Sequence, residues 1–125
     1  MASSQQDRIF AIVHQAWERL PVESIGSSIH CWKLRGGGGE TWRVRIEPGG
    51  VLASTRGLPA ECFVTVLEGK LRLQLFGNEV ELPAGHVADV PPNVPFSLRL
   101  GARSAATLLL GFCDRLDEPV PLEAL

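Results

Sequence analysis

The chain has 125 residues, a net charge of −2, a hydrophobic fraction of 45% and a charged fraction of 21%, which suits one globular domain. A charge so close to zero argues against a nucleic-acid partner, and no apolar run is long enough to cross a membrane. Three widely spaced cysteines (Cys31, Cys62 and Cys113) argue against a disulfide framework, and without an apolar signal segment we expect a cytoplasmic protein.

The first predicted element is a short α-helix within residues 1–23. Apolar residues recur there at spacings of three and four, as an amphipathic helix requires: Ile9, Phe10, Ile12, Val13, Ala16, Trp17 and Leu20. Ser3 or Ser4 can cap its start, and Pro21 stops it directly after the last apolar residue. We expect this helix to pack its apolar face on a sheet.

From residue 24 to residue 113 the pattern changes to short apolar runs between turn residues, which is typical of an all-β sandwich or barrel. Alternation is clearest over 41–46, where Trp42, Val44 and Ile46 alternate with two arginines. Further strands are predicted over 29–34, 62–67, 70–76, 79–82, 87–90, 96–100 and 105–113. The acidic tail, 114–125, contains two prolines and is expected to lie extended on the surface.

Two motifs anchored by glycine resemble those of the cupin superfamily. Gly50 and Gly69 hold both glycine positions of the first cupin motif, G-x5-H-x-H-x3-E-x6-G, at residues 50–69. Gly85 and Pro91 hold the matching positions of the second, G-x5-P-x-G-x2-H-x3-N, at residues 85–100, and Asn93 replaces its inner glycine. The resemblance implies a cupin barrel (a double-stranded β-helix or jelly roll) over residues 24–113.

The positions at which cupins carry metal ligands hold other residues in this chain. The first two histidine positions fall on Arg56 and Leu58, the glutamate position on Cys62, and the last histidine position on Phe96. A divalent metal needs three or four converging donors, which one thiol beside a guanidinium does not supply. We therefore expect a barrel without a metal or another cofactor.

In the register that the resemblance implies, one face of each strand lines an apolar lumen. Ligand-binding residues are expected on that face, namely Arg56, Leu58, Cys62, Val64, Leu73, Phe96, Leu98 and Trp42. An inward guanidinium at Arg56 is costly without a partner. A ligand carboxylate, enolate or phenolate would supply that partner, and so would a structural carboxylate such as Glu61. The lumen side chains could also fill the barrel completely.

Three functions are compatible with these residues. The first is metal-independent binding of a small apolar or aromatic anionic ligand. The second is a metal-free isomerase, cyclase or lyase that acts on an enolisable small molecule, with Cys62, Glu61 and His30 as candidate catalytic residues. Cys62 would be a nucleophile if Arg56 lowered its pKa, whereas a buried cysteine acts as a small hydrophobic residue. The third is a structural or interaction role with a filled barrel.

Phe63 and Leu67 lie on the opposite face of the strand that carries Cys62. A lone barrel would expose them to water, so either the N-terminal helix or a second subunit should cover them. Cupins commonly pair sheet to sheet, and the resemblance therefore implies a homodimer. A monomeric mass in solution would count against that expectation.

Overall fold

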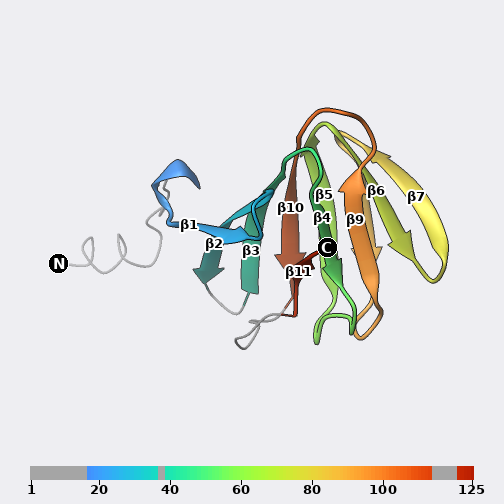
Figure 1. The fold of residues 1–125 in the computed structure, drawn as a ribbon. Coiled ribbons are helices and arrows are strands. Elements are labelled where there is room, and N and C mark those ends of the chain that lie inside the picture. The colour runs from blue at the N-terminus through green and yellow to red at the C-terminus, as the bar shows by residue number, and fades with distance from the viewer. Residues whose placement is uncertain (1–16, 37–38, 114–120) are drawn as a thin grey trace.

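A computed structural model describes residues 17–36, 39–113 and 121–125 and consists of two antiparallel sheets (Figure 1). The six-stranded sheet has the order β1 (Val22–Ile25), β2 (Ile29–Gly36), β3 (Gly39–Ile46), β10 (Ala106–Phe112), β5 (Cys62–Glu68) and β8 (Val87–Val90). The five-stranded sheet has the order β11 (Glu123–Ala124), β4 (Val51–Ser54), β9 (Phe96–Leu100), β6 (Lys70–Leu75) and β7 (Asn78–Pro83). The predicted all-β jelly-roll architecture is confirmed.

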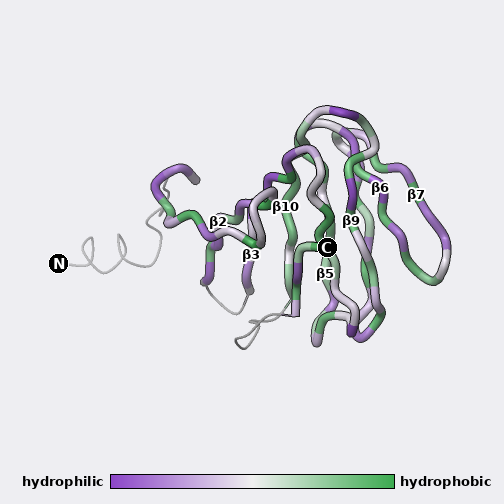
Figure 2. The backbone as a smooth tube through the Cα atoms, in the orientation of Figure 1, coloured by the Kyte–Doolittle hydropathy of each residue, from purple (hydrophilic) through white to green (hydrophobic). Residues whose placement is uncertain are grey.

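The strands lie where the alternation of apolar and polar residues predicted them. Every predicted strand forms close to its expected bounds, and in β3 the buried residues alternate along the whole strand. Figure 2 shows hydrophobic and hydrophilic residues alternating along the strands in both sheets. The inward residues of the two sheets form one hydrophobic core, in which Val44, Leu98 and Leu108 are completely buried.

The predicted N-terminal helix falls mainly on residues 1–16, which lie outside the described residues. Its end, Trp17–Arg19, forms a single 3-10 turn, η1, in which the Leu20 N–H donates to the Trp17 carbonyl at 3.1 Å. Within the described residues the expected α-helix is therefore only this turn. No helix in the described ranges has the length and apolarity that a membrane span requires.

The C-terminal tail lies partly outside the described residues, at 114–120. Its last part does not lie loose on the surface, because β11 pairs with β4 and extends the edge of the five-stranded sheet. The Leu125 N–H also donates to the Val51 carbonyl at 2.9 Å. The pattern of two residues was too short to predict this strand.

The outer face of β5 and β8 exposes apolar side chains, as predicted for Phe63 and Leu67. Phe63 and Leu67 are 39% and 43% exposed, and Val87, the cross-strand partner of Thr65, is 60% exposed. This arrangement agrees with the expected orientation of the strand. The homodimer that would cover this face stays a prediction.

Candidate functional site

The two motifs meet at one end of the barrel, because each contains a loop that crosses from one sheet to the other. The first loop joins β4 to β5 and the second joins β8 to β9. The Asn93 N–H in the second loop donates to the Leu58 carbonyl in the first at 2.7 Å. Asn93 has a φ of 62°, a left-handed conformation that asparagine tolerates better than most residues. This conformation explains why asparagine can replace the usual glycine.

Seven of the eight residues predicted to bind a ligand lie in the hydrophobic core. Each is at most 5% exposed, and all belong to one buried cluster: Trp42, Leu58, Cys62, Val64, Leu73, Phe96 and Leu98. A ligand at the centre of the barrel would have to displace these side chains. Their role in ligand binding therefore stays a prediction.

Arg56 is the eighth predicted ligand-binding residue, and its expected inward orientation is wrong. β4 ends at Ser54, and the chain then turns through Gly57 at a φ of 81°, so the alternation of the strand does not continue to residue 56. Arg56 is exposed. Water can solvate an exposed guanidinium, so it requires no anionic partner.

Cys62 is a buried thiol and not an activated nucleophile. Burial, together with smaller contributions from Cys113 and Asp89, raises its pKa to about 12, so the thiol is protonated at neutral pH. The lowered pKa that a nucleophile would need is therefore not found. Of the two interpretations of Cys62, the structure favours the small hydrophobic residue.

The buried thiols predict a loss of stability in alkali. Burial also raises the pKa of Cys31, to about 11, so both folded thiols hold their protons above the ordinary value of 9.0. The folded state thus binds more protons, and the stability that this provides is present below pH 9 and is lost as the pH rises toward 11 and 12. At pH 10 each thiol should lower the free energy of unfolding by roughly 1 kcal/mol.

Urea unfolding at pH 8 and pH 10 measures this loss. Cys62→Val should remove its share of the pH dependence, whereas Cys113→Val, at an exposed thiol, should not. An equal pH dependence in Cys62→Val and the wild type would contradict the assignment.

The three candidate catalytic residues do not form one acid–base set. His30 pairs with Arg45 in the β2–β3 register, and its Nδ1 lies 3.2 Å from Ser24 Oγ. Glu61 precedes β5, at the other end of this sheet, and its Oε1 lies 3.8 Å from Cys113 Sγ. Glu61 and Cys62 are thus far along the strands from His30.

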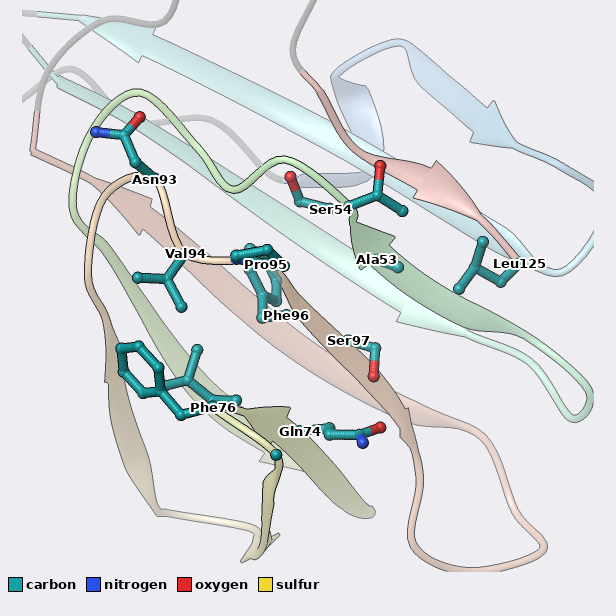
Figure 3. A pocket seen from close by; sticks show the side chains of 13 residues that line it. Ala53, Ser54, Gln74, Phe76, Asn93, Val94, Pro95, Phe96, Ser97 and Leu125 are labelled. Atoms are coloured by element: carbon teal, nitrogen blue, oxygen red, sulfur yellow. The ribbon is translucent and has the colours of Figure 1, made fainter.

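A groove of about 470 Å³ lies over the ends of β4, β6 and β9 (Figure 3). It includes the cross-strand partners Ser97 and Gln74, which face away from the core because the residues beside them, Leu73, Phe96 and Leu98, are buried. Its apolar wall includes Phe76 and Val94, whose side chains lie beside each other in Figure 3. None of the described residues that line the groove carries a charged side chain.

Phe76 at the rim of this groove has a strained backbone and an exposed ring. It occupies the β6–β7 turn with Gly77, at φ values of 53° and 74°, and two positive values in a two-residue hairpin favour Asn-Gly. The left-handed conformation costs a non-glycine residue about 1 kcal/mol. The Phe76 side chain is nevertheless 70% exposed, so burial of its ring offsets little of this cost.

A second group of residues at the same barrel end was missed in the sequence. Lys33, Arg35, Glu40 and Trp42 lie on the inward face of β2 and β3, where Glu40 is the cross-strand partner of Arg35 and of Phe112. A signal for Glu40 was present, because the alternation over 41–46 extends back by one step to residue 40. Glu40 was not counted in that alternation, because a charged side chain is not expected at an inward position.

Contacts within this group neutralise its charges. Trp42 Nε1 donates to Glu40 Oε2, and Arg35 Nε lies 3.0 Å from Glu40 Oε1. Lys33 Nζ lies 4.2 Å from the centre of the Trp42 ring and 3.2 Å from Glu23 Oε2. Each cation is therefore paired with a carboxylate, and Lys33 and Glu40 both contact the Trp42 indole.

Solved structures share this arrangement of strands. KdgF from Halomonas sp. superposes with a TM-score of 0.71 at 12% identity, over 84% of this chain and 96% of that one. An RmlC-like cupin from Shewanella frigidimarina gives 0.69 at 18% identity, over 89% and 92%. The Schizosaccharomyces pombe Cnp3 cupin domain gives 0.68 at 12% identity, over 82% and 74%. This chain has the cupin fold.

The cupin likeness concerns the fold alone at these identities. No protein-family model and no curated protein matches the sequence. The predicted resemblance, which rested on the glycine positions of the two motifs, is thereby confirmed at the level of the fold.

The residues of this cupin barrel do not fit a metal at the motif positions. Leu58 and Phe96 have no donor atom, the Arg56 guanidinium is exposed, and Cys62 offers one buried thiol. Elsewhere in the described ranges, no three His, Cys, Asp or Glu side chains gather closely enough to hold a metal ion. That the protein works without a metal stays a prediction.

Proposed function

We propose that this cupin barrel is a metal-independent binding protein for a small molecule with an apolar or aromatic part, held in the groove of Figure 3. The volume of about 470 Å³ lies in the usual range of small-molecule sites, roughly 300–1,000 Å³. The groove combines an apolar wall with a few polar groups, which is the usual composition of such sites.

The observation that carries this proposal is the conformation of Phe76. A phenylalanine is retained in a left-handed turn position, and its ring points into solvent at the rim of the groove. Local strain of this kind persists where the surrounding structure holds it, and it is concentrated at binding and catalytic sites. An aromatic ring of the ligand would cover the Phe76 ring and remove its apolar surface from water.

Polar groups in the groove favour an uncharged ligand. Ser97 and Gln74 present a hydroxyl and a carboxamide side by side. Hydroxyl, carbonyl or amide groups of a ligand could pair with them. The negative charge expected from the sequence depended on an inward Arg56, so we propose a neutral ligand for this groove.

Phe76→Asn tests the proposal, because asparagine suits the left-handed conformation but removes the ring. The variant should keep or gain up to about 1 kcal/mol of stability, and its affinity for a neutral aromatic ligand should fall about tenfold. A thermal-shift screen of neutral aromatic compounds would identify ligands, and calorimetry would measure both affinities.

Val80→Asn is the matched control, since Val80 is an exposed apolar residue of the neighbouring strand β7 and lies outside the groove. It should bind the same compounds as the wild type. Equal binding by Phe76→Asn, or a screen without any ligand, would contradict the proposal.

A further inference from the structure

A second hollow lies on the other sheet, where β2, β3 and β10 reach the motif end of the barrel. It has a volume of about 340 Å³, and Arg35, Glu40 and Phe112 are among the residues that line it. The described residues of this hollow and those of the groove in Figure 3 do not overlap. The two are therefore separate sites.

Glu40 presents an unsatisfied carboxylate oxygen at this hollow. The residue is only 2% exposed, and Oε2 is occupied by the Trp42 indole N–H. Oε1 lies 3.0 Å from Arg35 Nε, which is ion-pair distance, yet it accepts no hydrogen bond within the described part of the chain. A buried charged acceptor without a donor is costly, so a ligand donor at Oε1 would be favourable.

Arg35 and Glu40 together select against charged ligand groups. Their charges cancel, so an anion attracted by the guanidinium would meet the carboxylate, and a cation attracted by the carboxylate would meet the guanidinium. A primary carboxamide is neutral and carries an N–H donor beside a carbonyl acceptor. Its N–H can donate to Glu40 Oε1 while its carbonyl oxygen accepts from the Arg35 guanidinium.

Aromatic residues define the rest of the hollow. Phe112 lines it, and its ring meets the Trp42 ring edge to face, with centres 5.3 Å apart. Lys33, above the Trp42 ring, helps to hold the indole that fixes the other oxygen of Glu40. We propose that Arg35 and Glu40 bind the carboxamide group of a small molecule whose apolar part lies against Phe112.

Three compounds of nearly equal size test this assignment: benzamide, benzoate and benzylamine. Each is titrated into the wild-type protein while the indole N–H resonance of Trp42 is followed by NMR, assigned by elimination with Trp17→Phe and Trp32→Phe. We expect benzamide to bind about tenfold more tightly than either charged compound and to shift the Trp42 resonance. Benzoate or benzylamine binding as tightly as benzamide would overturn the proposal.

Two single substitutions should reverse the preference in opposite directions. Glu40→Gln removes the negative charge beside the guanidinium, so benzoate should become the tightest ligand; glutamine keeps an oxygen for the Trp42 N–H. Arg35→Met, at a side chain that is 40% exposed, leaves the carboxylate, so benzylamine should become the tightest. The Arg35 variant still decides the question if the Glu40 variant does not fold, and an unchanged order in a folded variant rejects the site.

Two controls separate this hollow from surface charge and from the groove. Glu81→Gln removes an exposed carboxylate whose Oε1 lies 2.9 Å from Lys70 Nζ, and it should leave all three affinities unchanged. Phe76→Asn should also leave benzamide binding at the Trp42 resonance unchanged. If Phe76→Asn abolishes that binding, benzamide is held in the groove of Figure 3 and the assignment to Arg35 and Glu40 is wrong.

Discussion

Gly57→Ala is expected to lower the free energy of unfolding by more than about 3 kcal/mol, because backbone strain and steric overlap add together. A Cβ atom at this position would stand 2.3 Å from Val94 N and 2.4 Å from the Asn93 carbonyl carbon. Both are backbone atoms of the β8–β9 loop, which cannot move aside as a flexible side chain can. The two motif loops would have to separate, and the Asn93–Leu58 hydrogen bond would be lost.

Gly49→Ala is the matched control for this prediction. Gly49 has a similar φ of 91°, but nothing lies within 4 Å of an added Cβ atom. It should therefore report the backbone strain alone, at about 1 kcal/mol. Urea unfolding of both variants measures the difference, and equal losses would show that the loops do not approach as closely as the structure indicates.

Trp42→Phe is expected to lower the free energy of unfolding by about 3 kcal/mol, mainly by removing one hydrogen bond. Phenylalanine preserves much of the apolar volume beside Phe112, but it cannot donate to Glu40 Oε2. The fully buried carboxylate would then have no donor on either oxygen within the described residues. The ion pair with Arg35 remains, but a buried carboxylate that loses a hydrogen-bond donor costs more than the bond itself contributed.

Adding Glu40→Met to Trp42→Phe should restore much of the lost stability. Methionine fills a similar volume without a charge, so the double variant buries no unsatisfied carboxylate. A double-mutant cycle by urea unfolding gives the coupling energy between the two positions. Additive losses would mean that the Trp42–Glu40 contact contributes little.

The sequence predicted those strands in which apolar alternation is long enough to see. Residues 41–46 and 62–67 alternate because one face of the sheet is buried, and the structure buries the expected residues. β1 was missed because its burial pattern shows no buried residue, so its sequence, Val-Glu-Ser-Ile, carries no such alternation. The glycines of the two cupin motifs predicted the barrel end correctly. They are required by the backbone conformation of the turns, which does not depend on what the loops bind.

Side-chain orientation in loops could not be predicted in the same way. Alternation applies only within a strand, and Arg56 stands two residues beyond the end of β4. Glu40 was missed for another reason: it continues the alternation of β3, but the predicted strand began one residue later, at 41. The groove at Phe76 depends on how the β6–β7 turn meets the β8–β9 loop, and one sequence does not determine such a contact.

β10 lies in the middle of the six-stranded sheet, between β3 and β5, although most of the other strands precede it in the chain. During synthesis the backbone N–H and C=O groups on the facing edges of β3 and β5 stay unpaired until residues 106–112 leave the ribosome. Pairings between residues so distant in sequence form slowly, because a long loop must close first. The barrel core is therefore completed only after β10 has been synthesised, and before then its open edges are exposed to pairing with other nascent chains.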